Sequence, residues 1–292
     1  MLEAASPEQV IYFFFAVLAL AWGACVGSFL NVCIHRIPRE LSVVAPRSHC
    51  PNCGKMIAWY HNIPLVSYLV LRARCRYCGA RIIPRYFIVE LLVACLFLLV
   101  WLKFDLADGS RALGLVPITD WKLVLVYWLM LSGLVLGTFV DFEHLIIPDR
   151  VTLGGIVAGV VLSALVPGLH GAASIRAALL ASALGAAVGW GSLWAVSVLG
   201  RMIFRKEAMG FGDVKLLGAI GAFLGWRAVL FTIVASSLFG SIVGVTLVLI
   251  GRKAMQSRIP YGPYLALAAL IWVLWGPALV DLYIRLIVPP IQ

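Results

Sequence analysis

The sequence predicts an all-α polytopic membrane protein with about eight transmembrane helices and a cysteine-rich polar loop between the first two. Three observations lead to this prediction. The 292 residues are 63% hydrophobic and only 12% charged, the mean hydropathy is +1.02, and the apolar residues form runs long enough to cross a bilayer. Lipid offers no partners for backbone N–H and C=O groups, and the runs are too continuously apolar for barrel strands, so they must be helical.

The apolar runs divide the chain into about eight candidate spans. The sixth span is short, which leaves it tilted, half-buried or re-entrant. The spans comprise residues 10–33, 84–102, 121–140, 151–167, 175–199, 213–226, 228–250 and 262–288.

The positions of Lys and Arg predict the orientation of these spans. With the N-terminus outside, the cytoplasmic loops hold seventeen of these residues and the external loops hold five, with Arg285 near the external C-terminus. Cytoplasmic loops carry such an excess, so both termini are expected outside. Basic loops beside anionic lipid also account for the net charge of +10 without a nucleic-acid partner. Because the first basic residue is Arg36, the first apolar run is not a signal peptide.

Small residues recur four positions apart inside several spans, a spacing that lets helix backbones approach closely. This spacing predicts a compact bundle rather than loosely associated helices. The pairs are Gly155/Gly159, Gly185/Gly189, Gly221/Gly225 and Gly240/Gly244.

The polar loop at 35–85 carries two C-x-x-C-G segments, with Cys50 and Cys53 in the first and Cys75 and Cys78 in the second. Each segment brings two thiolates to one face of a tetrahedron, and the following glycine permits a tight turn. We expect a structural four-cysteine zinc site in a zinc-ribbon-like cytoplasmic loop. Disulfides are disfavoured because the loop faces a reducing compartment. The expected organisation is therefore a first transmembrane helix at 1–34, a zinc-binding loop domain at 35–85 and a transmembrane bundle at 86–292.

Carboxylates at the expected cytoplasmic edge of the membrane are the candidate catalytic groups. Asp141 and Asp149 follow the third span, and Asp213 begins the sixth span between Gly210 and Gly212 on one side and Lys215 on the other. Two carboxylates in contact cannot both ionise easily, so one keeps a proton while the other activates water. The glycines supply flexible backbone that could admit an extended peptide. The alternative is that Asp149 and Asp213 only accompany helix starts.

Two further charged residues have open roles. Glu90 lies just inside the second span, where an unpaired carboxylate is costly; it either pairs with an arginine, which we favour, or helps to bind substrate or donor. Lys215 either neutralises the aspartate site, contacts substrate or lipid, or extends its charge to the interface.

Several blocks in order identify a family that the chain resembles, the type IV prepilin peptidases, which are bifunctional leader peptidases and N-methyltransferases. The resemblance runs nearly from end to end. The blocks are Gly27–Pro38, the two cysteine segments, Asn62–Tyr68, Arg85–Leu91, Asp141–Asp149, Met209–Leu217 and Pro260–Ala266.

The resemblance implies that Asp141 and Asp213 are the catalytic pair of a membrane aspartyl protease of the GxGD type, with Asp149 as a neighbour. It also implies a bacterial inner (cytoplasmic) membrane location. The substrates would be prepilins or pseudopilins, cut on the cytoplasmic side after a short basic leader, usually between Gly and Phe. The new N-terminus would then be methylated with S-adenosylmethionine. The four family cysteines fall on Cys50, Cys53, Cys75 and Cys78.

One departure from the family pattern keeps an alternative open. The family often has glycine just before the third cysteine, where this chain has Arg74, and no Gly-rich donor fingerprint is present. A peptidase without methyl transfer is therefore the nearest alternative. Two more distant alternatives are a transporter that uses the aspartates as an ion relay and an assembly scaffold in which the aspartates are structural.

Overall fold

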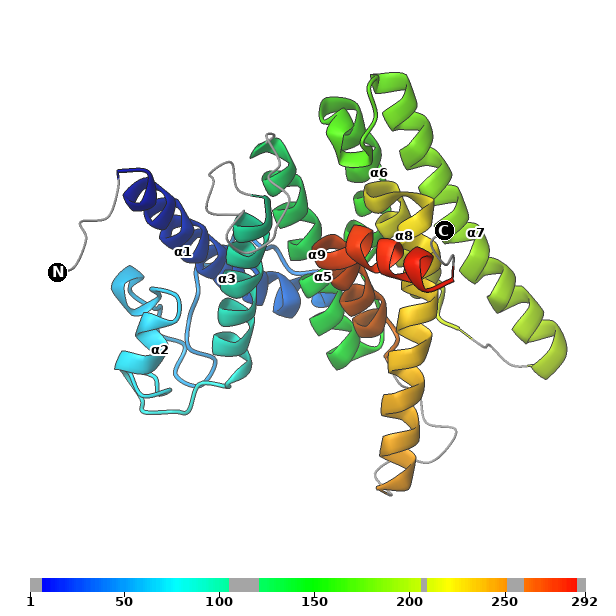
Figure 1. Ribbon diagram of the computed structural model, residues 1–292. Coiled ribbons are helices and arrows are strands. Elements are labelled where there is room, and N and C mark those ends of the chain that lie inside the picture. Colours follow the sequence, from blue (N-terminus) through cyan, green and yellow to red (C-terminus); the bar gives the residue numbers. More distant parts are fainter. Residues whose placement is uncertain (1–6, 105–120, 206–208, 251–259, 288–292) are drawn as a thin grey trace. The chain divides into compact units, whose positions relative to one another are not determined.

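The computed structural model describes residues 7–104, 121–205, 209–250 and 260–287, and every regular element in these ranges is a helix (Figure 1). Short helices lie in the loop after the first span and just before Ile175. The longer helices are α1 (Pro7–Arg36), α3 (Arg85–Phe104), α5 (Trp121–His144), α6 (Asp149–Leu165), α7 (Ile175–Phe204), α8 (Phe211–Leu249) and α9 (Gly262–Ile287). The shorter ones are η1 (Ile37–Arg39), η2 (Trp59–His61), α2 (Val66–Val70) and η3 (Pro167–His170).

Each long helix falls on one expected span, except that α8 covers both the sixth and the seventh. Among the described residues α1, α3, α5, α7 and α8 are long and apolar enough to cross a membrane. Apolar side chains also remain exposed along these helices, as they do where helices face lipid. The prediction of a helical membrane protein is confirmed. The number of eight spans stays a prediction, because α6 and the apolar part of α9 are shorter.

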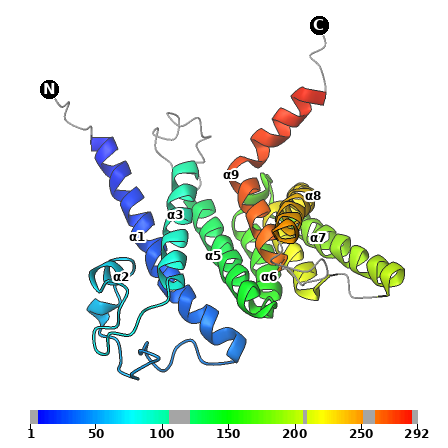
Figure 2. The same ribbon diagram turned by 90° about the horizontal axis from the view of Figure 1, so that it is seen from below.

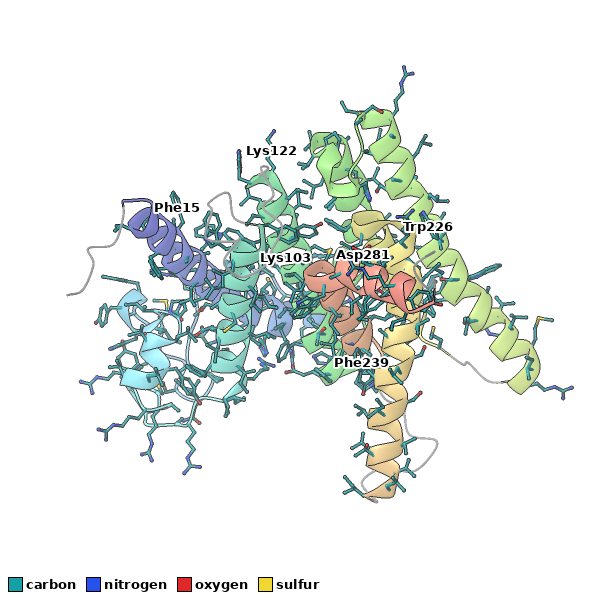
Figure 3. The ribbon with its side chains drawn as sticks, in the orientation of Figure 1. Phe15, Lys103, Lys122, Trp226, Phe239 and Asp281 are labelled. Carbon is teal, nitrogen blue, oxygen red and sulfur yellow. The ribbon has the colours of Figure 1, made fainter. Side chains whose placement is uncertain are left out.

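The chain divides into two compact units, Met1–Leu136 and Gly137–Gln292, and the boundary falls within α5. In the first unit α1 and α3 pack closely. A Cβ atom added to Gly27 would lie 2.7 Å from Cα of Glu90, so only glycine permits this approach. Phe15 of α1 (labelled in Figure 3) packs on Trp101 of α3 at a ring-centroid distance of 5.7 Å.

In the second unit α8 packs against α6, α7 and α9 (Figure 2). The expected glycine pairs make these contacts. Gly185 and Gly189 of α7 face backbone carbonyls of α8, and a Cβ atom at Gly159 of α6 would lie 2.7 Å from Cβ of Ala222 in α8. Packing through small residues replaces the missing hydrophobic driving force between helices in lipid.

Helix α8 is broken at Gly225, whose φ of 79° and ψ of 173° are not helical. A break leaves carbonyl groups of the preceding turn without their helical donors. The Ser182 hydroxyl donates to the Ala222 carbonyl at 2.8 Å, which compensates for one of them. Trp226 follows the break directly (Figure 3). The break corresponds to the gap that the sequence predicts between the sixth and seventh spans.

Candidate active site and metal centre

Asp141 lies in the last turn of α5, where the apolar run gives way to polar residues. Helix α5 ends three residues later, and Leu145 then takes a left-handed φ of 54° that turns the chain. The Asp141 side chain is only 5% exposed. The backbone N–H of Gly262 donates a hydrogen bond to its Oδ2 at 3.0 Å. This carboxylate is thus buried and held by the first residue of α9.

Asp213 lies in the first turn of α8, with Gly210 as the residue that precedes the helix. Its side chain is 9% exposed. A Cβ atom at Gly210 would lie 3.1 Å from Oδ2 of Asp213, so a larger residue there would press on the carboxylate. Gly210 therefore leaves room for the carboxylate, and Gly212 leaves room for Ile147.

Ile147 brings the segments that carry these two aspartates together. A Cβ atom at Gly212 would lie 3.3 Å from Cβ of Ile147, and one at Gly262 would lie 3.0 Å from its Cδ1. The structure thus places the two buried aspartates on segments of the second unit that contact each other through Ile147. That they form a catalytic pair stays a prediction.

Asp149 does not take part in this pair. It is the first residue of α6, follows Pro148, and forms an ion pair with Lys215 in which Oδ1 and Nζ lie 2.6 Å apart. Lys215 also lies over the ring of Phe211 at 5.1 Å. The pair joins the start of α6 to the first turn of α8, so Lys215 neutralises Asp149.

A pocket of about 330 Å³ lies between the residue before Gly210, the later part of α8 and the start of α9. Met209 lies four residues before Asp213, and Tyr261 precedes Gly262, whose N–H binds Asp141. The Tyr261 hydroxyl is hydrogen-bonded to Ser236 at 2.7 Å. The lining residues are Met209, Ser237, Gly240, Ser241, Tyr261 and Tyr264. An extended peptide chain beside the carboxylates would meet this mixed phenol, hydroxyl and thioether surface.

Glu90 of α3 is buried in the first unit and binds backbone. Its Oε2 accepts a hydrogen bond from the N–H of Leu65 at 2.8 Å. Leu65 has an unusual φ of 61°, so the contact holds a strained point of the polar loop against α3. The sequence favours an arginine partner for Glu90; the structure shows hydrogen bonds from this backbone N–H and from the Ser28 side chain.

The four cysteines of the polar loop converge, and their sulfur atoms all lie within 4.8 Å of one another. Sulfurs at the Zn–S distance in a tetrahedral site would be about 3.8 Å apart, and the Sγ atoms of Cys50 and Cys78 are 3.8 Å apart. The two segments fold alike. Gly54 and Gly79 both have positive φ, at 69° and 70°, which is the tight turn that the sequence predicts. The donor set and its spacing fit a tetrahedral metal ion.

Backbone groups prepare some of these sulfurs for the thiolate form. The backbone N–H groups of Cys53 and Asn52 lower the pKa of Cys50. The Ala80 backbone N–H and then the Asn52 side chain lower the pKa of Cys78 to about 6. The Lys55 backbone N–H acts in the same direction on Cys53, but desolvation and the neighbouring sulfurs outweigh it and raise that pKa to about 11. Four negatively charged thiolates at this spacing would repel one another, so the thiolate form of the cluster requires a cation bound between the sulfur atoms.

Sequence reasoning missed the residues that hold Asp141 in place. Gly262 contributes a backbone N–H, which no side-chain motif records, across 121 positions of sequence. The block from Pro260 to Ala266 was the signal that could have found it, since Pro-x-Gly-Pro before an apolar run marks a helix start.

Comparisons with known proteins give matches along most of the chain. The family model described as Bacterial Peptidase A24 N-terminal domain matches residues 21–104, and that described as Type IV leader peptidase family matches residues 128–245. The first match contains the four cysteines and the second contains both buried aspartates. No solved structure was found to match the chain.

Three similar proteins share the name prepilin leader peptidase/N-methyltransferase. The one from Myxococcus xanthus is 41% identical over 241 residues, which are 82% of this chain and 65% of that relative. The one from Aeromonas hydrophila is 35% identical over 97% of this chain and 98% of its own length. The one from Pseudomonas aeruginosa is 35% identical over 93% of this chain and 94% of its own length.

Proposed function

The chain belongs to the type IV leader peptidase family, and on that premise we propose that Asp141 and Asp213 are its catalytic residues. It is a prepilin leader peptidase with N-methyltransferase activity. The single observation that supports the catalytic assignment is that two buried carboxylates, from α5 and α8, lie on segments that contact each other through Ile147.

The pair supplies what peptide hydrolysis needs. A water molecule between two such carboxylates loses a proton to the ionised one, and its oxygen attacks the carbonyl carbon of the scissile peptide bond. The protonated carboxyl group donates to the carbonyl oxygen and stabilises the charge that develops there. Low exposure of both side chains keeps bulk water from competing for these hydrogen bonds.

The test uses purified full-length protein with Asp141→Ala and Asp213→Ala, each assayed on a prepilin in detergent or lipid. Both variants are expected to fold and to leave the prepilin uncut. Asp149→Ala is the matched control, because it removes an aspartate of the same block that lies outside the pair. Normal processing by either of the first two variants would refute the assignment.

The four cysteines support a structural zinc site. The ion would be held by Cys50, Cys53, Cys75 and Cys78. All four coordination positions would then be occupied by protein sulfur, and no position would be left for a substrate. The zinc therefore serves to fold the loop rather than to catalyse. Metal analysis of the purified protein is expected to give about one zinc per chain.

S-adenosylmethionine is the methyl donor that we propose for the second activity. The pocket beside the aspartates does not fit it, because its lining offers no carboxylate for ribose hydroxyls. We therefore assign no donor residues there. Mass spectrometry of the processed pilin is the test, since methylation adds about 14 Da to the new N-terminus. An unmethylated product would leave a peptidase alone.

The remaining proposals concern the membrane. We place the protein in the bacterial inner membrane with about eight spans and both termini outside, on the basis of the excess of Lys and Arg in alternate loops. The aspartates and the cysteine loop then face the cytoplasm, where prepilins or pseudopilins present their leaders. Labelling of single cysteines introduced near the termini and in the polar loop would test this orientation.

A further inference from the structure

The two aspartates of the pair have different hydrogen-bonding environments. Asp141 accepts the backbone N–H of Gly262, which is the first residue of α9 and one of the orphan donors of that helix. In the described part of the chain, no hydrogen bond reaches the side chain of Asp213, although it is nearly as buried. The field of α9 therefore acts on Asp141 through a direct contact.

The start of α9 is itself held in place. The Tyr261 hydroxyl is hydrogen-bonded to Ser236 at 2.7 Å, and Ser237 lies 3.4 Å from the same oxygen. Both serines belong to α8, beyond its break. Gly262 is closely surrounded, because a Cβ atom there would lie 2.9 Å from Oδ2 of Asp141 and 3.0 Å from Cδ1 of Ile147. The N–H thus points at one carboxylate oxygen and has little room to move.

Asp213 also lies near a helix start, that of α8, so the helix dipole alone does not decide which of the two acids is ionised. The direct N–H···O contact favours ionisation of Asp141, because a hydrogen bond to a charged oxygen is stronger than the field shared by a whole first turn. A proton on Asp213 in addition removes the repulsion between the two charges.

From these contacts we infer that Gly262 positions Asp141 as the general base of the pair, and that Asp213 carries the proton. This inference rests on the proposed function and assigns a separate role to each acid. Gly262 is a positioning residue, which acts on the substrate only through Asp141.

The reaction balances with these roles. The water O–H bond breaks and its proton goes to Asp141, while the water oxygen forms a bond to the carbonyl carbon. The proton of Asp213 moves to the carbonyl oxygen and gives a neutral tetrahedral diol. The C–N bond then breaks as Asp141 returns its proton to the leaving nitrogen. Asp213 regains a proton from the diol hydroxyl, and both acids end as they began.

Asparagine variants test the assignment, because asparagine is nearly isosteric with aspartate, donates hydrogen bonds and cannot act as a base. Asp213→Asn keeps a donor at the carbonyl oxygen, whereas Asp141→Asn loses the base. In single-turnover cleavage of a prepilin, the residual rate of Asp213→Asn is expected to exceed that of Asp141→Asn by about tenfold or more. Equal residual rates, or the opposite order, would overturn the inference while leaving the proposed peptidase intact.

Gly262→Ala tests the positioning contact, with Gly154→Ala as a control, since a Cβ atom at Gly154 has nothing within 4 Å. Gly262→Ala is expected to lower kcat about tenfold or more with KM nearly unchanged, because misplacing a catalytic group slows chemistry rather than binding. Gly154→Ala is expected to leave both constants alone. A Gly262→Ala enzyme with full kcat, or with only a raised KM, would refute the role of Gly262. Wild-type protein that fails to cut any prepilin would instead refute the proposed function.

Discussion

Removing one ligand of the four-cysteine cluster should release the metal and unfold the polar loop. Within residues 37–84 only Cys50 is buried, so the loop has almost no apolar core of its own. Structural zinc supplies about 10–16 kcal/mol in zinc-finger peptides at neutral pH. Such a loop, like other small domains that lack a core, depends on its metal for most of its folding free energy.

The perturbation is Cys75→Ser, with Cys95→Ser as the matched control, because Cys95 lies in α3 outside the cluster. Zinc is measured by mass spectrometry and loop folding by limited tryptic digestion, which reports on the exposed Arg72, Arg74 and Arg76. We expect about one zinc in the control, close to none in Cys75→Ser, and rapid cutting at these arginines only in the latter.

Acid should act in the same direction as the Cys75 substitution, because protons compete with zinc for the thiolates. The loop should therefore become sensitive to trypsin after exposure to acid and regain its resistance when zinc is restored at neutral pH. A zinc-free Cys75→Ser protein whose loop stays resistant to trypsin would refute the reasoning, since the fold would then not depend on the metal.

Three other predictions concern the second unit. Gly159→Ala should lower the free energy of unfolding by about 1–3 kcal/mol, because its Cβ would press on α8. Gly154→Ala should leave the stability unchanged. Thermal unfolding in detergent compares the two variants, and equal midpoints would contradict the close packing. In a double-mutant cycle on unfolding, Asp149→Ala and Lys215→Ala should show a coupling energy of only about 0.5–1 kcal/mol, because Asp149 is 62% exposed. A coupling energy above about 2 kcal/mol would contradict this expectation. Gly240→Leu should fill the pocket and raise KM for prepilin about fivefold or more, as measured by steady-state kinetics. An unchanged KM would show that the pocket does not bind the substrate.

Long apolar runs made the helices predictable, because burial in lipid leaves a helix as the only way to pair the backbone. The expected span at 84–102 corresponds to α3 (Arg85–Phe104), and that at 151–167 to α6 (Asp149–Leu165). The choice of partner for Asp213 was harder. Spacing and charge left Asp141 and Asp149 as alternatives until the family blocks favoured Asp141, and the structure places Asp149 at the surface with Lys215.

Two features could not be predicted because they depend on backbone geometry. The gap between the sixth and seventh expected spans indicates a break near residue 227, but Gly225 was expected only as a packing residue of a Gly221/Gly225 pair. A single positive φ leaves no mark in an apolar pattern, so the residue that breaks α8 could not be identified. The Gly262 contact with Asp141 joins positions far apart in sequence through a main-chain atom. Neither feature depends on the chemistry of a side chain, which is what sequence motifs record.

The break at Gly225 has a consequence for the lipid around the protein. A continuous helix would carry Ser237 about 42 Å away from Met209 at 1.5 Å per residue, yet both line one pocket. The arm that precedes the break is only about 21 Å long, shorter than the hydrocarbon core of about 30 Å. In the proposed orientation Asp213 lies at one interface, and we expect headgroups of the opposite leaflet to reach Trp226 and Arg227, whose ring and guanidinium lie 5.6 Å apart. We therefore expect the bilayer to thin over this part of α8, and the geometry of the aspartate pair to depend on the thickness of the host membrane.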